Sequence, residues 1–189
     1  MEAWKSVLKD DPTDWLLGED NPSVRYFALR DLMGRPESNP AVVSAREEIM
    51  RRGPVPELLE KQRDPSYLAG FPRFYTGKYA GLVWSLIALA ELGATPNAQI
   101  REQCEYLFRH SQDLLEGGFS QSAAARTGGG RLREVIPCLT GNMVWSLIRF
   151  GYLDDPRLQK GIDWLARYIR CNDGVEDDPA DRRPLPDHC

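Results

Sequence analysis

One five-residue segment occurs twice in this chain of 189 residues, and the repeat restricts what the chain can fold into. The letters VWSLI stand at residues 83–87 and again at 144–148, and each copy runs on to a glycine, Gly93 or Gly151. The two tryptophans are 61 residues apart and the two glycines 58, so the second copy is shorter by about one helical turn. A recurring unit with two helical patterns predicts a repeat architecture of helical hairpins.

Apolar residues at a spacing of three and four predict helices along most of the sequence. The Asn-Pro pairs at 21–22 and 39–40 each supply an N-cap followed by a proline at the first helical position. Between the second and third predicted helices lies a linker rich in proline, glycine and aromatic residues. The predicted helices span residues 21–34, 40–53, 78–93, 97–112, 139–151 and 156–170.

The helices of the two repeats alternate in kind. Residues 78–93 and 139–151 are apolar almost all round, whereas 97–112 and 156–170 are amphipathic. This alternation predicts an all-α fold with an inner layer of buried helices and an outer layer of helices that expose one face to solvent. The glycines at 128–130 lack the Lys-Ser/Thr of a phosphate-binding loop, so a flexible connector is expected there.

Several segments resemble one protein superfamily. Tyr106, Gln112 and the run Gly117-Gly118-Phe119 form an aromatic-glutamine-glycine pattern that resembles the repeat at the outer-helix ends of squalene and hopene cyclases. The letters YAGLVW at 79–84 and CLTGN at 138–142 are similar to bacterial and archaeal proteins with prenyltransferase or squalene-cyclase repeats. The resemblance implies an α/α toroid, built from helical hairpins.

The resemblance divides the chain into three regions. Residues 1–69 form an N-terminal helical region, residues 70–174 the cyclase-like repeats, and residues 175–189 a polar, proline-rich loop. Only three hairpins are predicted, fewer than a closed toroid contains. We therefore expect an incomplete toroid, an open arc, at the front of a longer protein.

The catalytic motifs of the superfamily are broken in this chain. Hopene cyclases protonate their substrate with an Asp-x-Asp-Asp motif, but Asp154-Asp155 stands where it should cap a helix and Asp177-Asp178 lies in the terminal loop. Protein prenyltransferases bind zinc through Asp-x-Cys, but Ile136 stands two residues before Cys138. The chain is therefore predicted to be inactive by itself as a cyclase or prenyltransferase.

A set of aromatic residues precedes or opens one apolar helix, and a tryptophan recurs inside both apolar helices. In a toroid the N-terminal ends of such helices line a central cavity, where aromatic side chains would hold an isoprenoid chain by apolar burial and stabilise cations with their ring faces. The alternative is that the same residues are ordinary core. The predicted cavity wall consists of Phe74, Tyr75, Tyr79, Trp84 and Trp145.

Cysteine and histidine residues suggest a zinc site. Cys138, His188 and Cys189 are the candidate ligands, because tetrahedral zinc takes nitrogen and sulfur donors. Adjacent residues such as His188 and Cys189 rarely both bind one tetrahedral ion without strain. Unpaired thiols and a loop histidine are the alternative.

Composition excludes some classes of function. The formal charge of −4 argues against non-specific binding of nucleic acid, which needs a basic face. No apolar run approaches the roughly 20 residues that span a bilayer. The four cysteines are widely separated, unlike those of a secreted disulfide scaffold, so a cytoplasmic protein with reduced thiols is expected.

A second function class competes with isoprenoid binding. Residues 21–32 are similar to the helix of a HEAT-type repeat, which would make the chain a non-catalytic α-solenoid scaffold for protein interactions. An uncapped third hairpin is further expected to expose Met143, Leu147 and Phe150 on an apolar face. That face would associate with a longer chain, a partner or a second copy.

Overall fold

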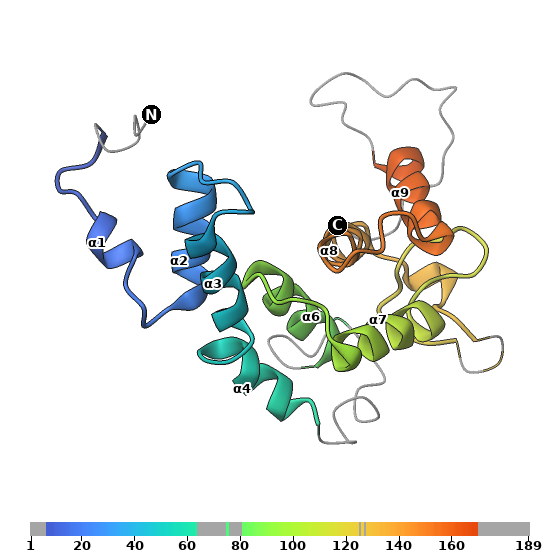
Figure 1. Ribbon diagram of the computed structural model, residues 1–189. Helices are drawn as coiled ribbons and strands as arrows, with labels where there is room; N and C mark the ends of the chain where they lie inside the picture. The colour runs from blue at the N-terminus through green and yellow to red at the C-terminus, as the bar shows by residue number, and fades with distance from the viewer. Residues whose placement is uncertain (1–6, 64–74, 76–80, 125, 127, 170–189) are drawn as a thin grey trace. The chain divides into compact units, whose positions relative to one another are not determined.

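The computed structural model describes residues 7–63, 75, 81–124, 126 and 128–169 (Figure 1). Helices are the regular secondary structure of these residues, and three isolated β-bridges are the only β-type pairings among them. The predicted all-α class is confirmed. The chain divides into two compact units, Met1–Arg63 with Glu91–Thr95, and Asp64–Ala90 with Pro96–Cys189.

The first unit is built on a pair of packed helices. α2 (Pro22–Phe27) continues as a π-helical turn, η2 (Ala28–Leu32), and packs against α3 (Pro40–Ile49). The side chains of Asn21 and Asn39 accept hydrogen bonds from the first-turn amides of α2 and α3, as the Asn-Pro pairs predicted. The buried side chains of the pair include Tyr26, Ala28, Leu29, Val42, Ala45 and Ile49.

Two short helices of this unit were not predicted. α1 (Thr13–Leu16) precedes the pair, and α4 (Pro54–Lys61) lies where a linker was expected. α4 follows Gly53, whose φ of 82° ends the preceding segment. The prolines of α4 occupy first-turn positions, where no amide donor is needed. Val55 and Leu59, one turn apart, supply its buried face.

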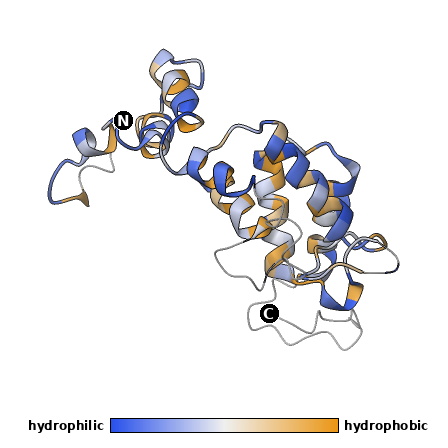
Figure 2. Ribbon diagram, turned by 90° about the horizontal axis from the view of Figure 1, so that it is seen from below, coloured by the Kyte–Doolittle hydropathy of each residue, from blue (hydrophilic) through white to orange (hydrophobic). Residues whose placement is uncertain are grey.

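The second unit contains the helices of the sequence repeat: α6 (Leu82–Glu91, whose last residue belongs to the first unit), α7 (Ala98–His110), α8 (Pro137–Arg149) and α9 (Pro156–Tyr168). α9 begins 58 residues after α7 begins and ends 58 residues after α7 ends, which confirms the register read from the repeat. Ile100 and Leu158, equivalent in that register, are both fully buried. Figure 2 shows apolar and polar residues interleaved along these helices.

α6 is shorter than predicted. Gly81 has a φ of 91°, a left-handed conformation that no residue inside a right-handed helix adopts, and α6 begins directly after it. Every residue of α6 before Glu91 is buried or half-buried, as an apolar helix requires. The expectation that Gly81 lies within the helix is wrong, and residues 78–80 lie outside the described part.

α8 buries the face that was expected to be exposed. Met143, Leu147 and Phe150 are 0%, 1% and 1% exposed, so the prediction of an apolar face at these residues is wrong. The opposite side of the helix carries the exposed apolar side chains, Trp145 and Ile148. α9 packs closely on α8 through Gly161, where a Cβ atom would lie 3.2 Å from Val144.

Two of the three glycines between the repeats are closely packed. Gly129 and Gly130 are buried, and the Gly130 amide donates to the Gln112 carbonyl oxygen at 2.8 Å. A Cβ atom on Gly130 would lie 2.1 Å from the Ser111 carbonyl oxygen, so only glycine fits. The expected flexible connector is therefore wrong for these two residues.

One glutamine joins three parts of the second unit. The buried side-chain amide of Gln112, just after α7, donates to the carbonyl oxygen of Gly117 at 2.8 Å and to that of Arg157 at 2.7 Å. It thus links the end of α7, the following loop and the first turn of α9. This is the glutamine of the aromatic-glutamine-glycine pattern, and Phe119, which ends that pattern, is fully buried.

Replacing this amide is expected to destabilise the second unit. Gln112→Met keeps the length of the side chain but removes both donated hydrogen bonds, which should lower the free energy of unfolding by about 1–3 kcal/mol. Urea denaturation measures the change. Gln159→Met is the control, because Gln159 is exposed and the hydrogen bond that its side-chain amide donates to the Leu153 carbonyl oxygen lies at the surface. Equal unfolding midpoints for the two variants would contradict the assigned role of Gln112.

Candidate functional site

The part of the predicted aromatic wall that the structure describes is centred on Tyr75. Its ring stacks on the indole of Trp84, with the ring centres 5.4 Å apart and an interplanar angle of 17°. The indole nitrogen of Trp84 donates a hydrogen bond to the Tyr75 carbonyl oxygen at 3.0 Å. Both residues are half-buried, so the stack is fixed on one side and accessible on another.

The same tyrosine reaches the second repeat. Its hydroxyl lies 3.4 Å from the thiol of Cys138, and either group can donate the hydrogen bond. Trp84 is the third residue of α6 and Cys138 the second of α8, so Tyr75 joins the beginnings of two helices that the repeat relates. Cys138 was predicted as a zinc ligand, and its contact with the aromatic wall was not predicted.

Trp145 lies farther along α8 on the same face as Cys138. The two residues are seven positions apart, which is close to two full turns and about 10 Å along the helix axis. The indole of Trp145 is 39% exposed, and the guanidinium of Arg149 lies 5.7 Å from its ring centre. Trp84 and Trp145, identical in the repeat, thus have different surroundings. We call Tyr75, Trp84, Cys138 and Trp145 the aromatic wall.

Other predicted site residues lie outside the described part of the chain: Phe74, Tyr79, His188 and Cys189. Within the described ranges, no three His, Cys, Asp or Glu side chains are grouped so that they could hold a metal ion. A zinc site that includes Cys138 with His188 and Cys189 therefore stays a prediction.

The acidic pair Asp154-Asp155 has the structural role that was expected. Asp155 caps α9, and its carboxylate accepts a hydrogen bond from the Arg157 amide at 2.8 Å. The Arg157 guanidinium binds Asp155 at 2.6 and 3.0 Å and Glu105 of α7 at 2.7 and 2.9 Å. It also lies 4.1 Å from the ring centre of Phe108. This cluster connects α7 to α9.

The ion cluster makes stability depend on acid pH. Hydrogen bonds from Arg157 hold the pKa values of Glu105 and Asp155 below their ordinary range. A carboxylate with a lowered folded-state pKa stabilises the fold fully above its unfolded pKa of about 4, and this contribution is lost as the pH falls through the folded-state value.

Arg157→Gln should therefore cost stability at pH 7, and the difference from the parent protein should disappear well below pH 4. The cost is expected to be under about 1 kcal/mol, because the side chains of Arg157 and Glu105 are each 39% exposed. Urea denaturation across this pH range measures it. Arg167→Gln, on the same helix, removes one pair with Glu116 at 3.1 Å and serves as the control. A difference that persists at low pH would contradict the assignment.

Cys104 is not a candidate nucleophile. It is fully buried in α7, and burial raises the pKa of its thiol to about 12. The thiolate, which is the reactive form, is therefore scarce at neutral pH. Of the cysteines that the structure describes, Cys138 is the exposed one.

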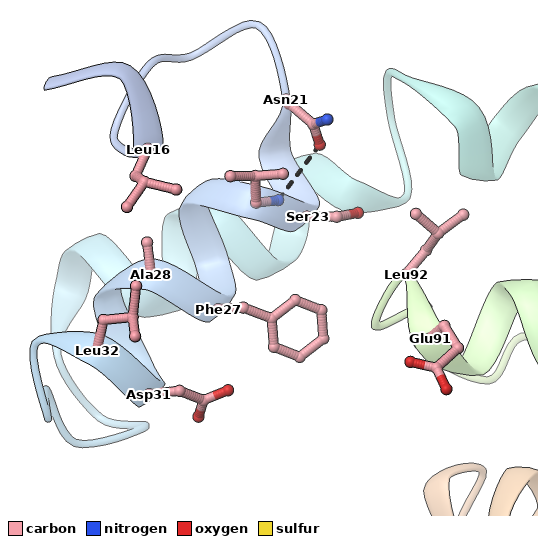
Figure 3. Close-up of a pocket in the computed structure, with 10 residues that line it drawn as sticks. Leu16, Asn21, Ser23, Phe27, Ala28, Asp31, Leu32, Glu91 and Leu92 are labelled. Atoms are coloured by element: carbon pink, nitrogen blue, oxygen red, sulfur yellow. Dashed lines mark hydrogen bonds between the residues drawn. The ribbon is translucent and has the colours of Figure 1, made fainter. Parts of the chain in front are cut away.

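A concave site lies in the first unit (Figure 3). Its cavity of about 410 Å³ is within the range of ligand and peptide pockets. The HEAT-like resemblance pointed to α2, but the contributions of α1 and of the Glu91–Leu92 segment depend on tertiary structure. The pocket, which we call the α2 groove, is lined by Leu16, Asn21, Ser23, Val24, Phe27, Ala28, Asp31, Leu32, Glu91 and Leu92.

In comparisons with protein-family models, curated proteins and solved structures, nothing matches this chain. The helices in the described ranges include none that is both long and apolar enough to cross a membrane.

Proposed function

We propose that the chain is a terpenoid cyclase/prenyltransferase-like helical-hairpin domain that binds an isoprenoid-type apolar molecule at the aromatic wall. The observation that carries this proposal is the double contact of Tyr75. Its ring stacks on Trp84 of α6, and its hydroxyl meets Cys138 of α8. An aromatic residue thus stands between the beginnings of two related helices, where the toroid resemblance locates a binding cavity.

The chemistry of the wall suits a branched hydrocarbon chain with one polar end. Trp145 and Ile148 expose 39% and 38% of their surface on α8, and covering such apolar surface yields about 25 cal/mol per Å². The Tyr75 hydroxyl and the Cys138 thiol offer hydrogen bonds to a terminal hydroxyl group. The ligand would lie along α8 from Cys138 toward Ile148.

Binding to the wall is expected to depend on its aromatic side chains. Trp145→Ala and Tyr75→Ala should each weaken the binding of tritiated farnesol by about tenfold, which corresponds to one exposed aromatic contact. Equilibrium dialysis measures the affinity. Tyr75→Phe should weaken binding less than Tyr75→Ala does, because it keeps the ring stack and loses only the hydrogen bond of the hydroxyl. Trp15→Ala, which removes a tryptophan that is 75% exposed on α1, is the matched control.

If Trp145→Ala and Trp15→Ala reduce farnesol binding equally, the aromatic wall is not the binding site. The absence of measurable farnesol binding would contradict the proposal itself.

Catalysis is not part of the proposal for this chain. The four residues of the aromatic wall include no carboxylic acid that could protonate an alkene. Incubation with squalene or farnesyl diphosphate is therefore expected to return unchanged substrate, as analysed by gas chromatography. A cyclised or transferred product would overturn this expectation.

A second candidate function belongs to another class, the HEAT-like interaction scaffold. The observation that favours it is the packed pair α2–α3, with the α2 groove on the HEAT-like helix. A scaffold of this kind would present the groove to a protein partner.

A further inference from the structure

The α2 groove combines an apolar floor with an accessible rim. Val24, Ala28 and Leu32 follow each other at intervals of four residues along α2 and η2, so they form one ridge of about 12 Å. Leu32 is 38% exposed at its end. Figure 3 shows the Phe27 ring between Ala28 and Leu32 on one side and Leu92 on the other. The floor is thus as long as two turns of a helix.

The charged residues that line the groove are both acidic, Asp31 and Glu91. The carboxylate of Asp31 is held by the guanidinium of Arg30 at 2.5 and 2.8 Å, which offsets its charge. Glu91 is exposed and takes part in none of the ion pairs among the described residues. No lysine or arginine is among the lining residues, so the rim has a net negative charge near Glu91.

We propose that the α2 groove binds a basic amphipathic helix of a partner protein. Two or three apolar side chains of that helix, spaced by three or four residues, would lie on the ridge from Val24 to Leu32, and a lysine or arginine beside them would pair with Glu91. Negative rim charge disfavours an acidic peptide or an anionic headgroup at the same site. This inference rests on the scaffold function and is independent of the aromatic wall, because every lining residue belongs to the first unit.

The test uses the full chain and a synthetic fluorescent helical peptide of about 18 residues, a length at which helices form in isolation. The peptide carries leucines on one face and lysines on the others, and a matched peptide replaces each lysine with glutamate. Fluorescence anisotropy measures the affinities at low and high salt. The lysine peptide should bind at least about tenfold more tightly than the glutamate peptide at low salt, and the gap should narrow as salt screens the charges.

Variants of the rim locate the binding site. Glu91→Gln and Leu32→Ser should each lower the affinity for the lysine peptide by about three- to tenfold. The first removes one charge and the second removes one apolar contact. Their controls are Glu57→Gln, an exposed acid on α4, and Val43→Ser, a valine on α3 that is 41% exposed. Both controls lie in the first unit outside the groove and should leave the affinity unchanged.

Three results would overturn the inference. The first is that the lysine peptide does not bind. The second is that both peptides bind equally, which would make the groove a general apolar pocket. The third is that Glu91→Gln and Leu32→Ser leave the affinity for the lysine peptide unchanged. The chain could then still be a scaffold, but its binding site would lie outside the α2 groove. Farnesol binding measured on the same variants separates these results from a failure of the aromatic wall, since neither substitution touches it.

Discussion

The buried amide of Gln112 is the interaction on which the second unit depends most. It satisfies two backbone carbonyl groups that lie 40 residues apart in sequence, at Gly117 and Arg157. Because one side chain makes both bonds, the end of α7, the loop after it and the start of α9 form a single packed arrangement.

The loop held by Gln112 in turn positions the beginning of α8. The amide of Phe119 donates to the hydroxyl of Thr140 at 2.9 Å, and the Ile136 amide donates to the Phe119 carbonyl oxygen at 3.1 Å. Gly118 makes room for Val135 and Trp164, where a Cβ atom would lie 2.5 and 2.9 Å from them. The first turn of α8 is therefore fixed from outside the helix, and with it the thiol of Cys138 beside Tyr75.

The two proposed sites differ in chemistry and in location. The aromatic wall in the second unit offers ring faces, a hydroxyl and a thiol, which suit an apolar molecule with a polar end. The α2 groove in the first unit offers an aliphatic ridge and an acidic rim, which suit a basic helix. Because no residue is shared between them, each can be tested by substitutions that leave the other intact.

Local sequence signals were sufficient for most of the longer helices. The caps at Asn21, Asn39 and Asp155 and the 58-residue register between α7 and α9 depend only on neighbouring residues and on the period of the helix. α4 was missed because its two prolines resemble a linker, although both stand in the first turn where a proline is tolerated. The glutamine pattern was visible as a motif, but its two carbonyl partners were not.

Tertiary structure decided which sides of the helices face the core. In a helix that is apolar almost all round, such as α8, the sequence does not indicate which face is buried. The burial of Phe150 and the exposure of Trp145 therefore depend on where α9 packs. The contact between Tyr75 and Cys138 joins residues 63 positions apart, and the α2 groove combines α1, α2 and the Glu91–Leu92 segment. Amphipathic periodicity is a property of one helix, whereas a site between elements exists only once several of them have packed.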